Sequence, residues 1–239
     1  MFSFSSRAFA RYRGGFFLEI IKTDPHGGIE STGQLIKYAS EISSSVKKRL
    51  REFRGPYSDR DLFRELVFCI LTAGASAVMG VRSVESLGDS IFDSSAAELA
   101  ALLKGHHRYP NARAGYIVRT RDYLKAEWNM DMNGIINSHF RDRQKRRDFF
   151  ASKNIVGIGY KEASHFLRNT GHKGYAILDK HVLAFLRQFG VINEEDIPSN
   201  RKRYLEIENK MKNFAERIGI DFDELDIVLW SAKTGEILK

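Results

Sequence analysis

Hydrophobic residues in this 239-residue chain recur three and four positions apart over long stretches, and this spacing constrains the fold more than any other feature. The strongest stripe runs through residues 201–218, ends at Gly219 and consists of Tyr204, Ile207, Met211, Phe214 and Ile218. We find no convincing period-two alternation of the kind that half-buried strands show. The sequence therefore predicts an all-α fold.

Other segments carry similar helical signals. Apolar stripes indicate helices over residues 61–73, 113–125 and 180–189, and a last helix should begin near Asp221–Asp223. Cys69, the one cysteine, falls inside the apolar stretch 66–71 and is expected in the core. A single cysteine excludes an intrachain disulfide, a cysteine-ligated zinc finger and an iron–sulfur cluster bound by several cysteines.

The order of these segments favours two helical lobes around a cleft. We expect a central lobe over residues 58–170, which ends in a helix-hairpin-helix motif at about 148–170, and a second lobe built from residues 29–57 and 174–239. Residues 1–28 should form an extension outside the fold. The first 18 residues contain three arginines and no acid. This composition fits a transit peptide, a basic arm or a start site placed too far upstream.

The formal net charge of +8 favours an anionic partner, most often nucleic acid. No run approaches the ~18 apolar residues that span a bilayer, so we expect no membrane partner. The seven histidines show no metal-ligand spacing, and we expect no metal site. An RNA-binding protein is disfavoured because the chain has no aromatic run of the RNP type.

The segment NIVGIGYKEASHFLRNTG, residues 154–171, places Gly157 and Gly159 at a tight turn before a helix. Glycines there permit positive φ and let backbone amides approach an anion such as a DNA phosphate at the helix N-terminus. Tight helix–helix turns also use glycine for purely structural reasons. The glycine pair alone therefore does not separate the two interpretations.

Lys161 lies in the first turn of the helix that begins near Tyr160. At helical spacing, the residues expected to pack inward are Ala163, Phe166 and Leu167. The residues on the opposite side are Lys161, Ser164, His165 and Arg168. The positive end of the helix dipole, together with Arg168, favours the neutral amine of Lys161, which is the form that attacks carbon. Lys161 is thus a candidate nucleophile, although a solvated surface lysine would fit the same spacing.

Asp179 follows Lys161 by 18 residues and immediately precedes the helix expected at 180–189. Aspartate is a favoured N-cap, and capping alone would justify it. A carboxylate held at a helix N-terminus can also stabilise a developing sugar cation or orient a nucleophile.

The pattern VGIGYKEASHFLRNTG…YAILDKH resembles the helix-hairpin-helix–Gly/Pro–Asp motif of base-excision DNA glycosylases. Stretches at 65–80, 107–124 and 202–239 narrow the resemblance to the archaeal-type 8-oxoguanine DNA glycosylase/lyase family, over roughly residues 35–239. The resemblance implies a monomer that acts without a cofactor on double-stranded DNA containing 8-oxoguanine, in the cytoplasm of a prokaryote at the nucleoid.

The resemblance also implies roles for individual residues. Lys161 would attack the anomeric carbon of a flipped nucleotide, expel the base, and form a Schiff base that cuts the strand by β-elimination. Asp179 would assist by electrostatic stabilisation and proton handling. Lys239, with its terminal carboxylate, would recognise the oxidised base, and Trp230, beside the apolar stripe of the last helix, is a candidate stacking surface.

Phosphate contacts are expected from the amides at Gly157 and Gly159, from Arg168, and from the basic stretches 106–121 and 141–148. The stretch TAGAS, residues 72–76, is less polar than the family pattern, so we expect few pocket contacts from it. Two alternatives stay open: a glycosylase for another damaged base, and a helix-hairpin-helix module that binds DNA without catalysis. The spacing between Lys161 and Asp179 weighs against the module.

Overall fold

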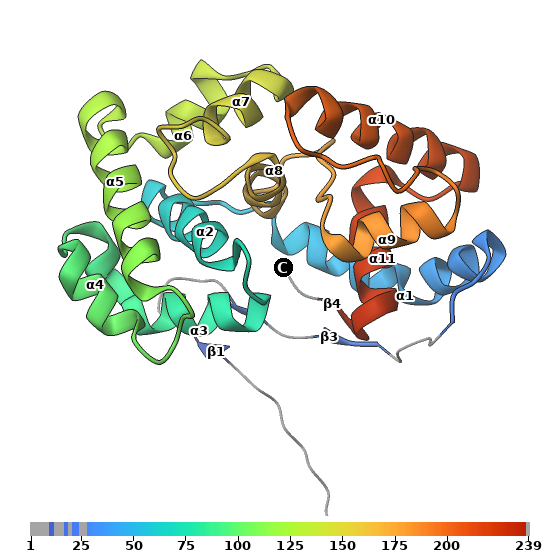
Figure 1. Ribbon diagram of the computed structural model, residues 1–239, viewed down its shortest axis with the longest axis horizontal. Coiled ribbons are helices and arrows are strands. Elements are labelled where there is room, and N and C mark those ends of the chain that lie inside the picture. Colours follow the sequence, from blue (N-terminus) through green and yellow to red (C-terminus); the bar gives the residue numbers. More distant parts are fainter. Residues whose placement is uncertain (1–9, 12–16, 19–20, 24–27, 238–239) are drawn as a thin grey trace, which may run out of the picture.

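The computed structural model describes residues 10–11, 17–18, 21–23 and 28–237, and the helices form two lobes side by side (Figure 1). The first lobe contains α2 (Asp59–Thr72), α3 (Ala77–Leu87), a 3-10 turn (Gly88–Phe92), α4 (Ala96–Leu103), α5 (Pro110–Trp128), α6 (Met132–Gly134), a π-helical turn (Ile135–His139) and α7 (Arg143–Phe150). The second contains α1 (Thr32–Glu52), α9 (Lys180–Gln188), α10 (Arg201–Ile218) and α11 (Phe222–Thr234). The predicted all-α fold is confirmed.

Helix α8 (Tyr160–Asn169) lies between the lobes and is seen end-on in Figure 1. Strand structure in the described residues is limited to two antiparallel pairs of two-residue strands. They are β1 (Ala10–Arg11) with β2 (Phe17–Leu18), and β3 (Ile21–Lys22) with β4 (Glu236–Ile237).

Local sequence signals set the helix ends. Ser31, Ser58 and Ser95 cap α1, α2 and α4 with reciprocal capping boxes, which satisfy amides that have no intrahelical acceptor. Gly219 adopts a left-handed conformation and ends α10 where the sequence predicted it. The last helix begins beside Asp221, its N-cap, as expected.

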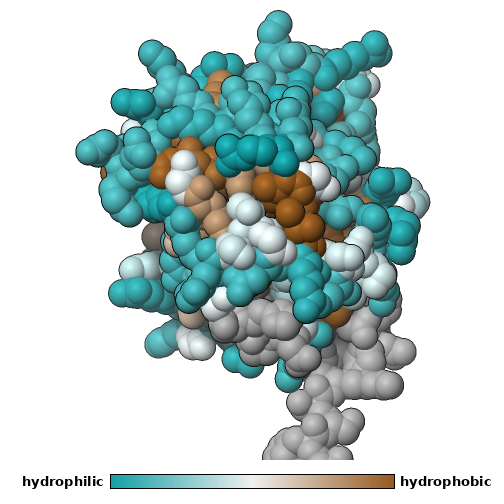
Figure 2. All heavy atoms as spheres, turned by 90° about the vertical axis from the view of Figure 1, so that its right-hand side faces the viewer, coloured by the Kyte–Doolittle hydropathy of each residue, from teal (hydrophilic) through white to brown (hydrophobic). Residues whose placement is uncertain are grey.

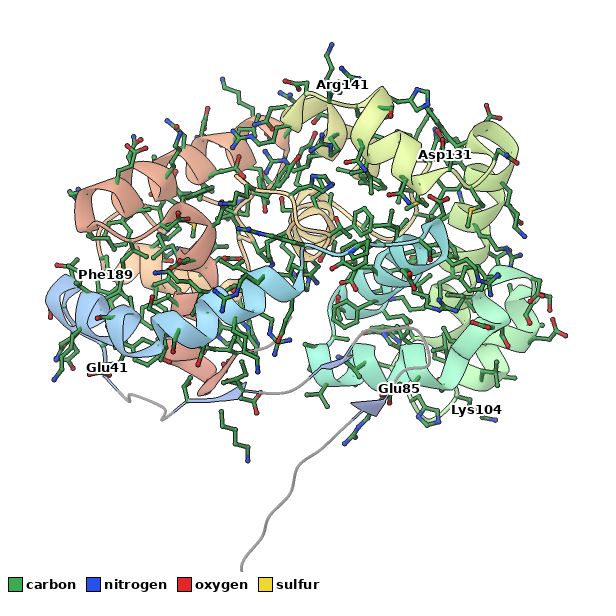
Figure 3. The ribbon with its side chains drawn as sticks, turned by 180° about the vertical axis from the view of Figure 1, so that it is seen from behind. Glu41, Glu85, Lys104, Asp131, Arg141 and Phe189 are labelled. Carbon is green, nitrogen blue, oxygen red and sulfur yellow. The ribbon has the colours of Figure 1, made fainter. Side chains whose placement is uncertain are left out.

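Each lobe has its own hydrophobic core. The first core draws buried residues from 62–175, including Cys69, and the second draws them from 29–53 and 176–237. Figure 3, seen from behind, shows Glu85 and Lys104 at the outer part of the first lobe and Glu41 and Phe189 at the opposite end of the molecule. Helix α8 serves both cores: Phe166 belongs to the first, and Tyr160 packs against the second.

We expected residues 1–28 to form an extension outside the fold, but residues 21–23 pair with the other end of the described chain. Ile21 pairs with Ile237, Lys22 pairs with Glu236, and the amide of Thr23 donates to the carbonyl of Gly235 over 2.8 Å. A strand of two residues is too short to display a period, so this pairing could not be predicted from the sequence.

A buried ion pair joins the lobes. The guanidinium of Arg147 on α7 is fully buried and donates to both carboxylate oxygens of Glu208 on α10, over 2.5 and 2.9 Å. Arg147 belongs to the basic stretch 141–148, from which we expected DNA contacts, but its position excludes it from such a role. Arg141 of the same stretch is exposed at the edge of the molecule in Figure 3.

Figure 2 shows the outer end of the second lobe. Most of this surface is hydrophilic, and hydrophobic residues gather at its middle. None of the helices in the described ranges is long and apolar enough to cross a membrane.

Candidate active site

A cavity of about 750 Å3 opens between the lobes beside α8. The first lobe contributes Thr72, Gly74, Ala75, Ser76 and Ala77 to its wall. Helix α8 contributes Lys161, His165 and Arg168. The second lobe contributes Ile177, Leu178, Asp179, Lys180, His181, Val182, Asp226, Ile227, Trp230 and Thr234. The cavity therefore brings together Lys161 and Asp179, the two residues that the sequence singled out for catalysis.

Lys161 is half-buried at the start of α8, with 29% of its side chain exposed. Its ammonium lies 3.3 Å from a carboxylate oxygen of Glu162. The same carboxylate group accepts the amide of Gly159 through its other oxygen, as part of the capping box of α8. Glu162 thus ties the amine to the helix start, so that Lys161 is positioned by the turn that begins the helix.

The rest of the polar face of α8 is buried rather than open. Ser164 is fully buried, and His165 and Arg168 are only 7% and 6% exposed. Helical spacing placed these residues opposite the side that packs inward, but spacing cannot show that residues of α2, α7 and α11 cover them. Ser164 instead accepts a hydrogen bond from Arg147, and the His165 ring packs edge-on against Phe68.

Arg168 points into the protein and lies over the ring of Phe53. One of its terminal nitrogens is 3.4 Å from a carboxylate oxygen of Asp226 on α11. The expectation that Arg168 contacts a DNA phosphate assumed an exposed side chain, and that assumption is wrong. The residue instead forms part of the cavity wall.

Asp226 is a buried carboxylate that the sequence did not single out. Burial raises the pKa of its carboxyl to about 6, and this effect outweighs the opposing attraction of Arg168; the charge of Asp179 raises the pKa further. The long separation from Arg168 is consistent with a weak ion pair. Asp226 precedes Trp230 by four residues, one helical turn, and that spacing could have indicated that both face the same cavity.

Asp179 is the N-cap of α9. One of its carboxylate oxygens accepts the amides of His181 and Val182, each over 2.8 Å. These two bonds leave its second oxygen for another partner. The capping and catalytic interpretations of Asp179 are therefore compatible in this geometry.

Trp230 is half-buried on α11 and lines the cavity, whereas Leu225, Val228, Leu229 and Ala232 are buried in the second core, as the stripe predicted. Thr234, at the end of the same helix, also lines the cavity. Lys239 lies outside the described residues.

The hairpin before α8 is held closely against α5. Gly157 has φ +88, and a Cβ there would lie 2.4 Å from the ring of Tyr116. The amide of Val156 donates to the hydroxyl of Thr120 over 2.9 Å. Gly159, the N-cap of α8, is exposed. The first amides of α8 have no intrahelical acceptors, as at any helix N-terminus.

Thr72, Gly74, Ala75 and Ser76 line the cavity, whereas we expected few pocket contacts from residues 72–76 because they are less polar than the family pattern. Thr72 donates its hydroxyl to the carbonyl of Cys69, while Gly74 and Ala75 line the wall with little side chain of their own. These small residues therefore leave room in the cavity and offer few side-chain groups for binding. Within the described ranges, no three His, Cys, Asp or Glu side chains gather as a metal ion would require.

Comparison with known proteins agrees with this geometry. Residues 46–220, which include Lys161 and Asp179, match the model of the 8-oxoguanine DNA glycosylase family that has a helix-hairpin-helix motif. The chain belongs to the 8-oxoguanine DNA glycosylase family. Similar proteins include the 8-oxoguanine DNA glycosylase/AP lyase of Korarchaeum cryptofilum, 45% identical over 84% of this chain and 93% of that protein. The 8-oxoguanine DNA glycosylase/AP lyase of Methanocaldococcus jannaschii is 39% identical over 84% of this chain and 94% of that protein.

Solved structures of the family share the fold. The 8-oxoguanine DNA glycosylase of Thermotoga maritima superposes with a TM-score of 0.77 at 37% identity and covers 87% of this chain and 98% of that one. The M. jannaschii glycosylase/lyase bound to a 15mer DNA containing 8-oxoguanine superposes with a TM-score of 0.76 at 38% identity. This superposition covers 86% of our chain and 100% of that one. Trp230 and β4 lie beyond the residues that the family model matches.

Proposed function

We propose that this protein is a bifunctional DNA glycosylase and AP lyase that excises 8-oxoguanine from double-stranded DNA. The observation that carries the proposal is the cavity in which Lys161 and Asp179 meet, in a chain that belongs to the 8-oxoguanine DNA glycosylase family. The relatives and the DNA complex named above support the choice of lesion.

In the first step, the Lys161 ammonium gives up a proton to the Asp179 carboxylate, and the resulting neutral amine attacks the anomeric carbon of the flipped nucleotide. The glycosidic C–N bond breaks, its electron pair leaves with the base, and the base takes up a proton. The sugar ring then opens to a Schiff base between Lys161 and the former anomeric carbon. Loss of a proton from the neighbouring carbon expels the 3′ phosphate and cuts the strand.

Asp179 supports this chemistry from the opposite wall. Positive charge develops on the sugar as the glycosidic bond breaks, and a fixed carboxylate stabilises it without reorganising. The two amide bonds from α9 hold the carboxylate in place throughout. Its second oxygen is the one that faces the sugar or accepts a proton.

The target base must leave the stack and enter the cavity. Trp230 offers it a flat surface, and Lys239 contacts its edge. 8-Oxoguanine carries an N–H at position 7 where guanine has only an acceptor, so a pocket that pairs with this N–H rejects guanine by leaving a buried polar group unpaired.

The surrounding duplex is held mainly through phosphates. Phosphate contacts come from backbone amides of the hairpin at Gly157 and of the first turn of α8, where the Gly159 amide would exchange its bond to Glu162 for a phosphate, and from the exposed basic residues of 141–146. We infer that the protein acts as a monomer at the nucleoid of a prokaryotic cell, since its substrate is DNA and the relatives are archaeal or from Thermotoga.

The test compares three duplexes: one with 8-oxoguanine opposite cytosine, one undamaged, and one with a preformed abasic site. Wild type should release the oxidised base and cut both modified duplexes but not the undamaged one. Lys161→Gln should do neither. Lys180→Gln is the matched control, because Lys180 lines the same cavity but is exposed, and it should retain both activities. Cleavage of the abasic duplex alone would indicate another target base, and binding without any cleavage would indicate a non-catalytic DNA-binding module.

A further inference from the structure

The hydroxyl of Tyr204, on α10, contacts both of the segments that carry Lys161 and Asp179. Tyr204 belongs to the apolar stripe of its helix, and its side chain is buried, with only 1% of the residue exposed. Burial raises the pKa of its hydroxyl, so the group stays protonated and able to donate. Because a buried hydroxyl needs hydrogen-bond partners, those partners show which parts of the site Tyr204 holds in place.

On one side, Tyr204 holds the segment that leads to Asp179. Its hydroxyl donates to the carbonyl of Ala176 over 2.7 Å and accepts the amide of Leu178 over 3.4 Å. The amide of Ala176 donates to Glu208, one turn along α10, over 3.0 Å. Asp179 immediately follows Leu178. Two bonds to Tyr204 and one to Glu208 therefore attach the backbone before Asp179 to α10.

On the other side, Tyr204 contacts the start of α8. The hydroxyl of Ser164 lies 3.3 Å from that of Tyr204 and donates to the carbonyl of Tyr160 over 2.8 Å. The ring centroids of Tyr160 and Tyr204 are 5.7 Å apart. Lys161 immediately follows Tyr160 in the first turn of the helix. Tyr204 is therefore in contact with the residue before Lys161 as well as with the segment before Asp179.

We propose that Tyr204 is a positioning residue that fixes the separation between the Lys161 amine and the Asp179 carboxylate. The inference rests on the proposed function of the cavity. Proton transfer between these two groups requires them to lie within hydrogen-bond reach of each other. A displacement of about 1 Å can slow an enzymatic reaction about 100-fold. Because base excision and abasic-site cleavage both use the Lys161 amine, loss of the Tyr204 hydroxyl should slow both reactions.

The experiment removes one hydroxyl from the full-length protein. Tyr204→Phe keeps the ring and deletes the bonds to Ala176 and Leu178. Tyr175→Phe is the matched control, because Tyr175 is also buried and its hydroxyl donates to a backbone carbonyl, that of Arg143 on α7, over 3.0 Å. Excision of 8-oxoguanine and cleavage at a preformed abasic site are measured in single turnover over a range of enzyme concentrations. Each series gives a maximal rate and a half-saturating concentration.

Tyr204→Phe should lower the maximal rate of both reactions about tenfold and leave the half-saturating concentration within about twofold of wild type. A loss of stability alone would act differently. It would reduce the concentration of folded enzyme, which raises the half-saturating concentration and leaves the maximal rate unchanged. Tyr175→Phe should stay within about twofold of wild type in both quantities, since its hydroxyl bonds to α7 and not to the segment before Asp179.

The inference is overturned if Tyr204→Phe reaches the wild-type maximal rate, if it slows excision but not abasic-site cleavage, or if Tyr175→Phe slows both reactions as much. Failure of wild type to excise 8-oxoguanine would instead contradict the proposed function.

Discussion

Replacing Arg147 tests how the two lobes are held in the arrangement that creates the active-site cavity. Its guanidinium is fully buried among Tyr160, Tyr175 and Tyr204, with its central carbon 5.8, 5.5 and 5.2 Å from their ring centroids. It donates to both oxygens of Glu208, and Glu208 also accepts the amide of Ala176 over 3.0 Å. The pair therefore links α7, α10 and the segment that leads to Asp179.

Arg147→Ala leaves the Glu208 carboxylate buried with one amide as its remaining partner. Breaking a buried, hydrogen-bonded pair from one side costs about 3–5 kcal/mol, because the abandoned charge keeps its desolvation penalty. A cavity the size of the arginine stem adds to this cost. For a domain of this size, the loss corresponds to a fall in Tm of roughly 6–20 °C.

The assay is urea unfolding of wild type, Arg147→Ala, Glu208→Gln and the double variant. The double variant should be destabilised by less than the sum of the single variants, because neither charge is then left alone. Arg143→Ala is a control: Arg143 is exposed on the same helix and donates to the carbonyl of Gly174. A loss below about 1 kcal/mol for Arg147→Ala, or strict additivity, would refute the argument that this pair holds the lobes together.

Three further predictions concern the cavity and the hairpin. Burial raises the pKa of Asp226 to about 6, so its carboxyl stabilises the fold at low pH and this contribution is lost as pH rises from about 4 through 6. In urea unfolding, the free energy of unfolding of Asp226→Asn should therefore rise by about 3 kcal/mol relative to that of wild type between pH 4 and 7. A difference between the two proteins that does not change with pH would contradict the raised pKa of Asp226. Gly157→Ala should cost about 1–3 kcal/mol of stability and weaken binding to DNA, because its φ is positive and its Cβ would meet Tyr116. Gly190 also has a positive φ, +65, but with open space around it, so Gly190→Ala should cost less and leave DNA binding unchanged. Trp230→Ala should slow 8-oxoguanine excision about tenfold or more in single-turnover assays and leave abasic-site cleavage within about twofold, since only excision uses base stacking. Equal losses in both reactions would argue against stacking.

The sequence predicted the elements whose signals are local. Spacing and capping within one segment predicted the apolar stripe of α10 and its end at Gly219. They also predicted the start of α11 at Asp221 and the buried residues around Trp230. The proposed catalytic residues could also be found from the sequence, because Lys161 and Asp179 each lie at the start of a helix. Of the other residues that line the cavity, Arg168 and Trp230 were also named from the sequence, and His165 and Asp226 lie one helical turn from Lys161 and Trp230, whereas Ile177 and Ile227 carry no local signal.

The errors concern contacts between distant segments. The burial of the polar side of α8 could not be predicted, because nothing within that helix shows that residues of α2, α7, α10 and α11 contact it. Arg147 looked like one more cation in a basic stretch because its partner, Glu208, lies 61 residues away. Strand β3 escaped notice because two residues cannot display a period, and its partner β4 lies at the other end of the described chain.

Borohydride trapping shows directly whether Lys161 is the nucleophile. A labelled duplex with 8-oxoguanine opposite cytosine is incubated with sodium borohydride and wild type, Lys161→Gln or Lys180→Gln, and the adduct is mapped by peptide mass. We predict a covalent adduct at Lys161 with wild type and with Lys180→Gln, and none with Lys161→Gln. An adduct that persists in Lys161→Gln, or that maps to Lys180, would contradict the account.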